Sequence, residues 1–276
     1  MWKSLCVGVA ALLLLPACGL IGEQGDGHKV TVSRELFGFT QVENRSQLEV
    51  VVREAATESV NVTLDENLQQ YITTHVSRET LVIDDTTLLS YSGEGQIVVT
   101  LPRFLGAKGE GSGSLLVEGV TQSNALTFKL EGSGDMRYCG PASSLAAHLS
   151  GSGNMTLCTP LEQVIDKVDL KLDGSGDLSY DGSVKSLDAS SDGSGDISLS
   201  GSAPRFVARV EASGDIDAKA LTSSEAELSL SGSGNLSATI TDVVSVKLSG
   251  SGNVDLWGGA AIRDVHLDGS GNLRRH

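Results

Sequence analysis

The sequence contains few aromatic, proline or basic residues. Phenylalanine, tyrosine and tryptophan make up 4% of its 276 residues, there are five prolines, and 20 lysines and arginines stand against 35 aspartates and glutamates. A hydrophobic core must therefore be built mainly from aliphatic side chains. The formal charge of −15 argues against nucleic acid as a partner, because a phosphate backbone requires a basic surface.

Long apolar runs are missing as well, except at the N-terminus. Lys3 precedes "LCVGVAALLLLPA" (5–17), which is too short to span a bilayer comfortably and is typical of a signal peptide over residues 1–17. The run ends in "LPAC", which resembles the lipobox of bacterial lipoproteins. That resemblance implies lipidation of Cys18, export, anchoring to a membrane through the lipid and, with Gly19 next, an outer-membrane location. Residues 18–29 are expected to form a short tether. An ordinary secretory signal with an incidental Cys18 is the alternative.

Glycine, by contrast, is abundant and recurs at a fixed spacing. Nine copies of a motif of the type G-S-G-[DN] begin at residues 111, 132, 151, 174, 193, 212, 232, 250 and 269. Successive copies are 18 to 23 residues apart. Such a tight period is typical of a solenoid with one coil per repeat.

Apolar and polar residues alternate on both sides of each copy, as in "LKLDGSGDLSY" (170–180). A period of two on both sides indicates a strand, a turn and a second strand, with one face buried. No 3.6-residue stripe lies between copies, which disfavours a leucine-rich repeat. We therefore expect an all-β fold, a single-stranded parallel β-helix with about 20 residues per coil. Its nine repeats cover residues 106–276.

The glycines are expected at the corners of the coils. Glycine adopts positive φ without a Cβ penalty, and the small serine stacks without crowding. The Asp or Asn that ends each motif tolerates left-handed geometry and can bond its side chain to nearby backbone amides. Residues 30–105 lack the motif but alternate in runs such as "VNVTL" and "IVVTLP". They are expected to form wider first coils, so that residues 30–276 make one β-helix domain.

The repeated G-S-G-[DN] corners and three N-terminal segments together resemble a known family. The segments are "FGFTQVE" (37–43), "VNVTLDENL" (60–68) and "YITTHVSRETLVI" (71–83). The chain resembles the "putative auto-transporter adhesin head GIN domain" family over nearly all of residues 30–276. The resemblance implies a right-handed parallel β-helix on a secreted or lipid-anchored envelope protein. It carries no set of binding residues over to this chain.

Two cysteines fall in the same register of adjacent coils. Cys139 and Cys158 each lie four residues past the Asp or Asn that ends a motif, so stacking brings their Cα atoms about 5 Å apart. Both are expected to point outward, and an exported protein meets an oxidising compartment. The sequence thus favours a Cys139–Cys158 disulfide, with two stacked free thiols as the alternative. Cys6 leaves with the signal peptide.

The residue that ends each motif forms a column along the stack. A calcium ladder is one reading of this column, but half of it is neutral Asn and calcium needs six or more oxygens. We therefore expect turn formation, with no metal and no cofactor. The members of the column are Asp135, Asn154, Asp177, Asp196, Asp215, Asn235, Asn253 and Asn272.

Two further outward columns flank the corner. The mostly basic column contains Lys129, His148, Lys171, Ser190, Arg209, Ser229, Lys247 and His266. The mostly acidic column contains Glu131, Ser150, Asp173, Asp192, Glu211, Ser231, Ser249 and Asp268. Their proximity offsets the like-charge repulsion within each column. Solvated charge pairing is the simpler interpretation, and a surface for a protein or polysaccharide ligand is the functional one.

Catalysis has little support in the sequence. The five histidines include no H-E-x-x-H spacing and no G-x-S-x-G elbow occurs, so no catalytic residue is predicted. The leading hypothesis is a non-enzymatic, lipid-anchored envelope scaffold for adhesion or assembly. A carbohydrate-active β-helix enzyme, a lyase or hydrolase, is the alternative from another class. A self-associating structural element is the third possibility.

Overall fold

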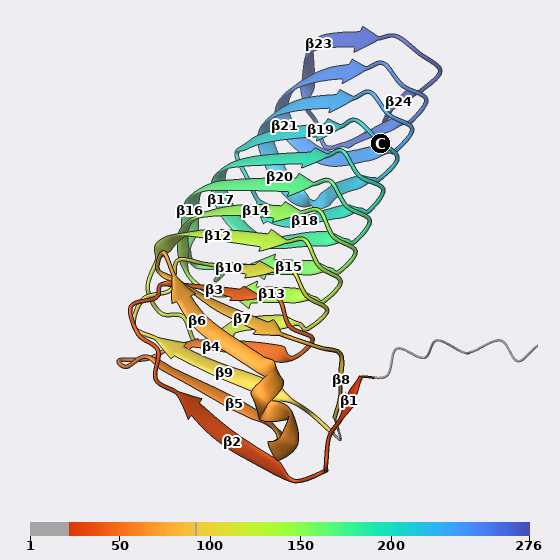
Figure 1. Ribbon diagram of the computed structural model, residues 1–276. Helices are drawn as coiled ribbons and strands as arrows, with labels where there is room; N and C mark the ends of the chain where they lie inside the picture. The colour runs from red at the N-terminus through yellow and green to blue at the C-terminus, as the bar shows by residue number, and fades with distance from the viewer. Residues whose placement is uncertain (1–21, 92) are drawn as a thin grey trace, which may run out of the picture.

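The computed structural model describes residues 22–91 and 93–276 and is an all-β solenoid (Figure 1). Strands make up 60% of it and helix 2%, in about nine turns of roughly 19 residues. Parallel coils stack along the molecule from the base, near β2 (Lys29–Arg34), to the far end at β23 (Ala261–Leu267). The fold class expected from the glycine repeat is confirmed.

Each coil contributes one strand before its corner and one after it. We call the two sheets that result the approach face and the exit face. Strands pair in register from coil to coil, with shifts at a few bulges. The approach face comprises β10 (Gly106–Gly109), β12 (Asn124–Leu130), β14 (Ala142–Leu149), β16 (Val164–Leu172), β19 (Arg205–Val210) and β23, with the second halves of β17 (Leu178–Ser191), β20 (Ile216–Leu230) and β21 (Leu236–Leu248). The exit face comprises β11 (Leu115–Glu118), β13 (Met136–Cys139), β15 (Met155–Cys158), β18 (Ile197–Ser202), β22 (Val254–Trp257) and β24 (Leu273–Arg275), with the first halves of β17, β20 and β21.

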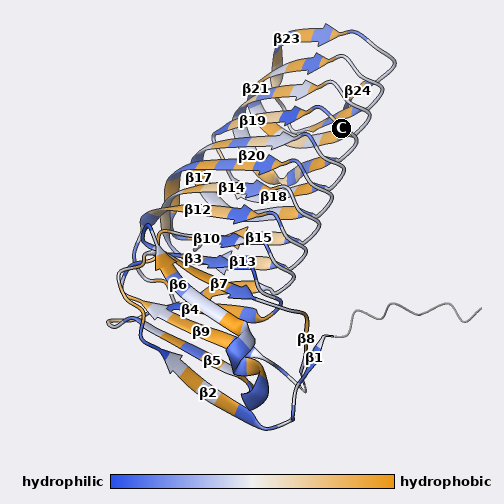
Figure 2. Cartoon of the chain, in the orientation of Figure 1, coloured by the Kyte–Doolittle hydropathy of each residue, from blue (hydrophilic) through white to orange (hydrophobic). Residues whose placement is uncertain are grey.

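The core lies between the two faces and is mainly aliphatic. Burial alternates along the strands, and in β12 Leu126, Phe128 and Leu130 are buried while the residues between them are exposed. Hydrophobic and hydrophilic residues accordingly alternate along the ribbon of the coils (Figure 2). Three of the aromatic residues cluster near the first repeats, where the ring of Phe128 lies 5.1 Å from that of Tyr138 and 6.0 Å from that of Phe104. Burial raises the pKa of Tyr138, whose hydroxyl donates to the carbonyl of Pro141 at 2.6 Å.

The corners differ from the sequence-based explanation in one respect. Among the corner glycines of the described residues, only Gly269 has a positive φ, of 139°. The others are required because coils stack closely: a Cβ on Gly176 would overlap the carbonyl oxygen of Gly153 in the coil below. The serine amide between the glycines bonds across the same gap, as from Ser175 to the carbonyl of Gly151 at 3.1 Å.

Residues 30–105 include two parallel coils, but their order in space is not their order in sequence. β3 (Gln41–Asn44) and β4 (Glu49–Glu54) lie directly beneath β10 and β11. β7 (Thr80–Asp85) and β9 (Gln96–Leu101) come later in the chain yet lie on the other side of β3 and β4. The coil formed by residues 41–54 is therefore sandwiched between two later ones.

The remaining N-terminal strands are antiparallel, and the expectation of wider coils throughout residues 30–105 is wrong for them. β5 (Ser59–Asp65) pairs antiparallel with both β2 and β9, and β6 (Ile72–Ser77) pairs antiparallel with β7. The 3-10 helix η1 (Glu66–Tyr71) joins β5 to β6. Together β2, β5, η1 and β6 form a cap over the base of the solenoid (Figure 1).

The segment expected to be a free tether is attached to this cap. β1 (Glu23–Gln24) pairs parallel with β8 (Leu89–Ser90), and the backbone amide of Asp26 donates to the Asn67 side chain at 3.0 Å. Residues 18–21, Cys18 included, lie outside the described residues. Ordered structure thus begins by Glu23, earlier than residue 30.

Candidate functional site

The Asp/Asn column forms a continuous hydrogen-bonded ladder. From Asp135 to Asn235, each Oδ1 accepts from the backbone amide of the equivalent residue in the next coil, as from Asp196 to Asp177 at 3.0 Å and from Asp215 to Asp196 at 2.8 Å. At the far end the Oδ1 of Asn253 instead accepts from the side-chain amide of Asn272 at 3.1 Å. In the first repeat Ser114 takes this place, and its hydroxyl accepts from the amide of Asp135 at 3.3 Å. The side chains therefore bind the coils to one another instead of closing their own turns. Within the described residues no group of three or more His, Cys, Asp or Glu could hold a metal ion.

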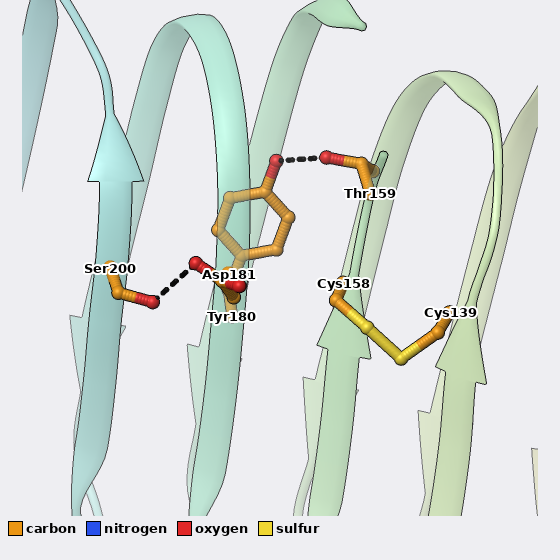
Figure 3. Close-up of a disulfide and its surroundings, with 6 residues drawn as sticks. All are labelled: Cys139, Cys158, Thr159, Tyr180, Asp181 and Ser200. Atoms are coloured by element: carbon orange, nitrogen blue, oxygen red, sulfur yellow. Dashed lines mark hydrogen bonds between the residues drawn. A yellow bond between two sulfur atoms is a disulfide. The ribbon is translucent and has the colours of Figure 1, made fainter. Parts of the chain in front are cut away.

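The disulfide pair lies on the exit face. Cys139 of β13 lies directly opposite Cys158 of β15 in the strand pairing. Their Cα atoms are 4.5 Å apart, and their sulfurs are bonded (Figure 3). Next to the bridge, the hydroxyl groups of Tyr180 and Thr159 are 3.2 Å apart in the interior, just past the end of β15. On the outer surface the Ser200 hydroxyl donates to Asp181 at 2.6 Å. The bridge clamps two neighbouring coils at a point where their strands already pair.

A shallow groove of about 560 Å³ runs across the exit face beside this bridge. Small hydroxyl side chains from successive coils form its floor, and two cations and two anions also line it. Its lining includes Arg137, Thr156, Ser179, Ser198 and Asp217. The floor has little relief because successive coils place a small hydroxyl side chain, Thr156, Ser179 or Ser198, at the same position.

The basic and acidic columns lie side by side on the approach face, as expected. Lys171 contacts Asp173 at 2.8 Å and Asp192 at 3.9 Å, and His148 also reaches Asp173, at 2.8 Å. Partial burial alone would raise the pKa of Asp173, but hydrogen bonds from Lys171 and His148 lower it further than burial raises it. Ion pairs thus neutralise the middle of the basic and acidic columns.

The pairing is incomplete. Among the described residues, Lys129, Arg209 and Lys247 make no ion pair, although they stand in the same basic column. Two shallow grooves, of about 390 and 550 Å³, include these cations in their walls. The approach face therefore carries unpaired positive charge on a chain whose formal charge is −15. Sequence reasoning placed the column but could not tell which cations lack a partner, because that depends on side-chain conformation.

Two loop-closing carboxylates were not identified from the sequence. Glu54 accepts hydrogen bonds from the amide of Gln122 at 3.2 Å and from the Thr121 hydroxyl at 2.8 Å, and Glu58 accepts from the amides of Gly38 and Phe39 at 3.0 Å. Burial alone would raise the pKa of Glu54, but these bonds lower it below its ordinary value. Both residues stand outside the repeat, so no periodic signal marks them, and their role is to hold loops.

Comparison with known proteins agrees with the geometry. The family model described as "Putative auto-transporter adhesin, head GIN domain" matches residues 38–165 and 160–260. No curated protein sequence matches the chain. Among the crystal structures to which it is similar are three at identities that support the fold alone.

The first of them, a "putative adhesin" from Parabacteroides distasonis, has a TM-score of 0.69 at 19% identity, covering 92% of this chain and 99% of that one. A "putative adhesin" from Parabacteroides merdae has a TM-score of 0.67 at 17% identity, with coverage of 92% and 98%. A "Putative lipid binding protein" from Parabacteroides distasonis has a TM-score of 0.63 at 20% identity, with coverage of 92% and 99%. Because the family model covers most of the solenoid, the chain belongs to the auto-transporter adhesin head GIN domain family.

Proposed function

We propose that the protein is a non-enzymatic scaffold of the cell envelope, anchored by a lipid on Cys18, that uses the flat faces of its solenoid for adhesion or assembly. The observation that carries this proposal is the regularity of the coils. Strand pairing in register repeats the same side-chain positions along both faces, and the grooves on them are shallow. Repeated, flat surfaces suit an extended protein or polysaccharide ligand, which contacts equivalent positions on several coils.

Membership of the adhesin family supports an extracellular or envelope location. No helix among the described residues is long and apolar enough to cross a membrane. Anchoring at the N-terminus would attach the capped base of the solenoid to the bilayer, since the described chain enters at β1 beside the cap. The solenoid would then project away from the membrane.

The anchor is tested by metabolic labelling with palmitate in cells that express the full chain. We expect a labelled protein in the membrane fraction, and loss of both label and membrane association in the Cys18→Ser variant. Label that persists in Cys18→Ser would contradict lipidation at this residue.

The binding face is tested with an array of envelope polysaccharides and surface proteins. Lys129→Ser, Arg209→Ser and Lys247→Ser combined remove the three unpaired cations, and serine already occupies this column at Ser190 and Ser229. We expect at least a tenfold loss of affinity for an array ligand with an intact fold.

A matched control removes three exposed cations elsewhere that make no ion pair, with Lys29→Ser, Arg78→Ser and Arg103→Ser, and should bind normally. Equal losses in both variants would mean that net charge, and not this face, determines binding. New reducing ends released from any polysaccharide, and lost on substitution of a single carboxylate, would overturn the non-enzymatic proposal.

A further inference from the structure

The two shallow grooves of the approach face adjoin one another. Lys129 and Lys171 line the first, Lys247 lines the second, and Arg209 lines both. The strands that carry these residues, from β12 to β21, are stacked along the solenoid (Figure 1). We call the combined feature the approach groove. It crosses the strands and follows the long axis of the molecule.

Permanent cations stand in every second coil of the approach groove. From β12 to β21 the basic column alternates between a Lys or Arg and a His or Ser. In chain order its members are Lys129, His148, Lys171, Ser190, Arg209, Ser229 and Lys247. Because paired strands are about 4.8 Å apart, a strand with a cation recurs about every 10 Å. Lys108, one coil before Lys129, does not follow the alternation, but it is paired with Glu110 and Glu131.

Carboxylates stand in coils between these cations. In each strand the residue two positions before the basic column also lines the groove. From the second half of β17 to β21, this residue is charged beside each serine and uncharged beside each cation. The successive pairs are Asp188 with Ser190, Val207 with Arg209, Glu227 with Ser229, and Ser245 with Lys247. The groove therefore repeats every two coils in both signs of charge.

These charges are available to a ligand. Among the described residues, neither the arginine nor the lysine of the second groove makes an ion pair. Glu227 contacts Arg205 at 3.7 Å, and this pair is weak because both side chains are 62% exposed. Lys167 contacts both Asp169 and Asp188, at 2.9 and 3.3 Å, so it neutralises only one of these two carboxylates.

We propose that the approach groove binds a linear acidic polysaccharide that carries one carboxylate in each disaccharide. A pyranose ring lengthens an extended polysaccharide by nearly the height of one coil, so a disaccharide spans two coils. Carboxylates of the ligand then meet Lys129, Arg209 and Lys247, the three cations of the column that make no ion pair among the described residues. This ligand class deepens the proposed function and rests on it.

The uncharged ring of each disaccharide lies over the coils between the cations. Its hydroxyl groups can donate to Glu227 or Asp188 and exchange hydrogen bonds with Ser229 or Ser190. An acidic ring at the same place would face a carboxylate and be repelled. The groove thus selects against a polysaccharide with a charge on every ring.

The charge of the whole chain confines such a ligand to this groove. The formal charge is −15, so most of the surface repels a polyanion. Exposed ion pairs are individually weak and are screened by salt, so binding requires several contacts along one ligand. Lys129 and Lys247 lie six coils apart, about 29 Å, which is spanned by about seven sugar rings.

Binding is measured by titration calorimetry on the chain from residue 18 onward carrying Cys18→Ser. The probes are octasaccharides of hyaluronan and of unsulfated chondroitin, with one carboxylate per disaccharide, of polygalacturonate, with one on every ring, and of uncharged dextran. We expect hyaluronan or chondroitin to bind at least tenfold more tightly than polygalacturonate, and dextran not to bind. Affinity should fall with added salt, and it should rise with ligand length up to the octasaccharide and little beyond.

The two-coil period is tested by moving one cation without changing the net charge. Ser229→Lys with Lys247→Ser places the second cation one coil from Arg209 instead of two. This variant should bind the one-carboxylate probe at least tenfold more weakly, with unchanged thermal melting. The control with Lys29, Arg78 and Arg103 replaced by serine should bind that probe normally.

The carboxylates between the cations are tested by Asp188→Asn with Glu227→Gln. Removing both charges should strengthen the binding of polygalacturonate at least threefold, so that discrimination between the probes falls. Failure of both one-carboxylate probes to bind at about 1 mM, equal binding of polygalacturonate to the unaltered chain, or full affinity after the cation is moved would each overturn the proposal.

Failure of this ligand class can be told apart from failure of the proposed function. A protein or an uncharged polysaccharide that binds the array, and is lost when Lys129, Arg209 and Lys247 become serine, would refute the acidic ligand while leaving the scaffold intact. Palmitate label that persists in Cys18→Ser, together with normal hyaluronan binding, would refute the anchor while leaving the polysaccharide site intact.

Discussion

At each corner of the solenoid two glycines flank a serine, and a carbonyl oxygen of the coil below occupies the place of a Cβ. The second glycine occurs in all nine copies, but the first is replaced once, by Ala212. At that corner the described residues show no bond from the Ser213 amide to Gly193, whereas the other serines that stack on a preceding repeat bond at 2.9–3.2 Å. The chain thus tolerates a methyl group at the first position by giving up one hydrogen bond.

This difference predicts unequal effects of alanine at the two positions. Gly174→Ala should behave as Ala212 does and lower stability only by about 1 kcal/mol, for one lost hydrogen bond. Gly176→Ala, at the second position, should lower it by about 1–3 kcal/mol because the stacked coils must separate. Thermal melting compares the two, and an equal or larger loss for Gly174→Ala would contradict the assignment.

The Asp/Asn ladder makes a second prediction at the same scale. Asp196→Ala removes the acceptor of the Asp215 amide and should reduce stability by about 1 kcal/mol. Asp196→Asn keeps the acceptor and relieves repulsion between three stacked carboxylates, so it should be neutral or slightly stabilising. Denaturant unfolding measures both. Added calcium should not change either unfolding midpoint. A calcium-dependent rise of the midpoint would indicate that the Asp/Asn column binds the metal.

The disulfide acts at the scale of the element, since it fastens β13 to β15. In the chain-entropy description, closing a loop of 19 residues contributes about 3 kcal/mol. We expect Cys139→Ser with Cys158→Ser to lower the melting temperature without changing the circular dichroism spectrum. Thiol titration of the unfolded, unreduced chain should find neither cysteine free. Two titratable thiols would show that the protein keeps the pair reduced.

The cap is the other element with a stability prediction. Leu68 of η1 is fully buried against the base of the core, so Leu68→Ala should cost about 2–5 kcal/mol. Gln70→Ala, on the exposed side of the same 3-10 helix, is the control and should change stability little. If both substitutions were equally mild, the cap would not be sealing the core.

At the scale of the whole molecule, each coil contacts mainly its neighbours, so stability is expected to vary along the axis. Amides of residues 261–276 should exchange with solvent fastest, and those of β3, β4, β7 and β9 slowest. Hydrogen exchange by mass spectrometry measures this gradient. Uniform protection along the solenoid would contradict it.

The repeat region could be predicted from sequence because its period is visible and stacking then fixes each register, as it did for Cys139 opposite Cys158. The cap could not. A period of two marks β2 and β5 as strands but is the same for parallel and antiparallel pairing. Strands near the base also pair with strands far away in the sequence, as β3 does with β10.

The position of the coil at residues 41–54, between two coils made later, imposes an order of assembly. A chain that emerges N-terminus first cannot lay this coil on a finished neighbour, and both its edges stay bare until residues 80–118 have followed. From Asn124 onward, each new coil meets a completed template. Coils can therefore fold in the order in which they are synthesised only from Asn124 onward. We expect the slowest folding step to be the closure of the coils on both sides of residues 41–54.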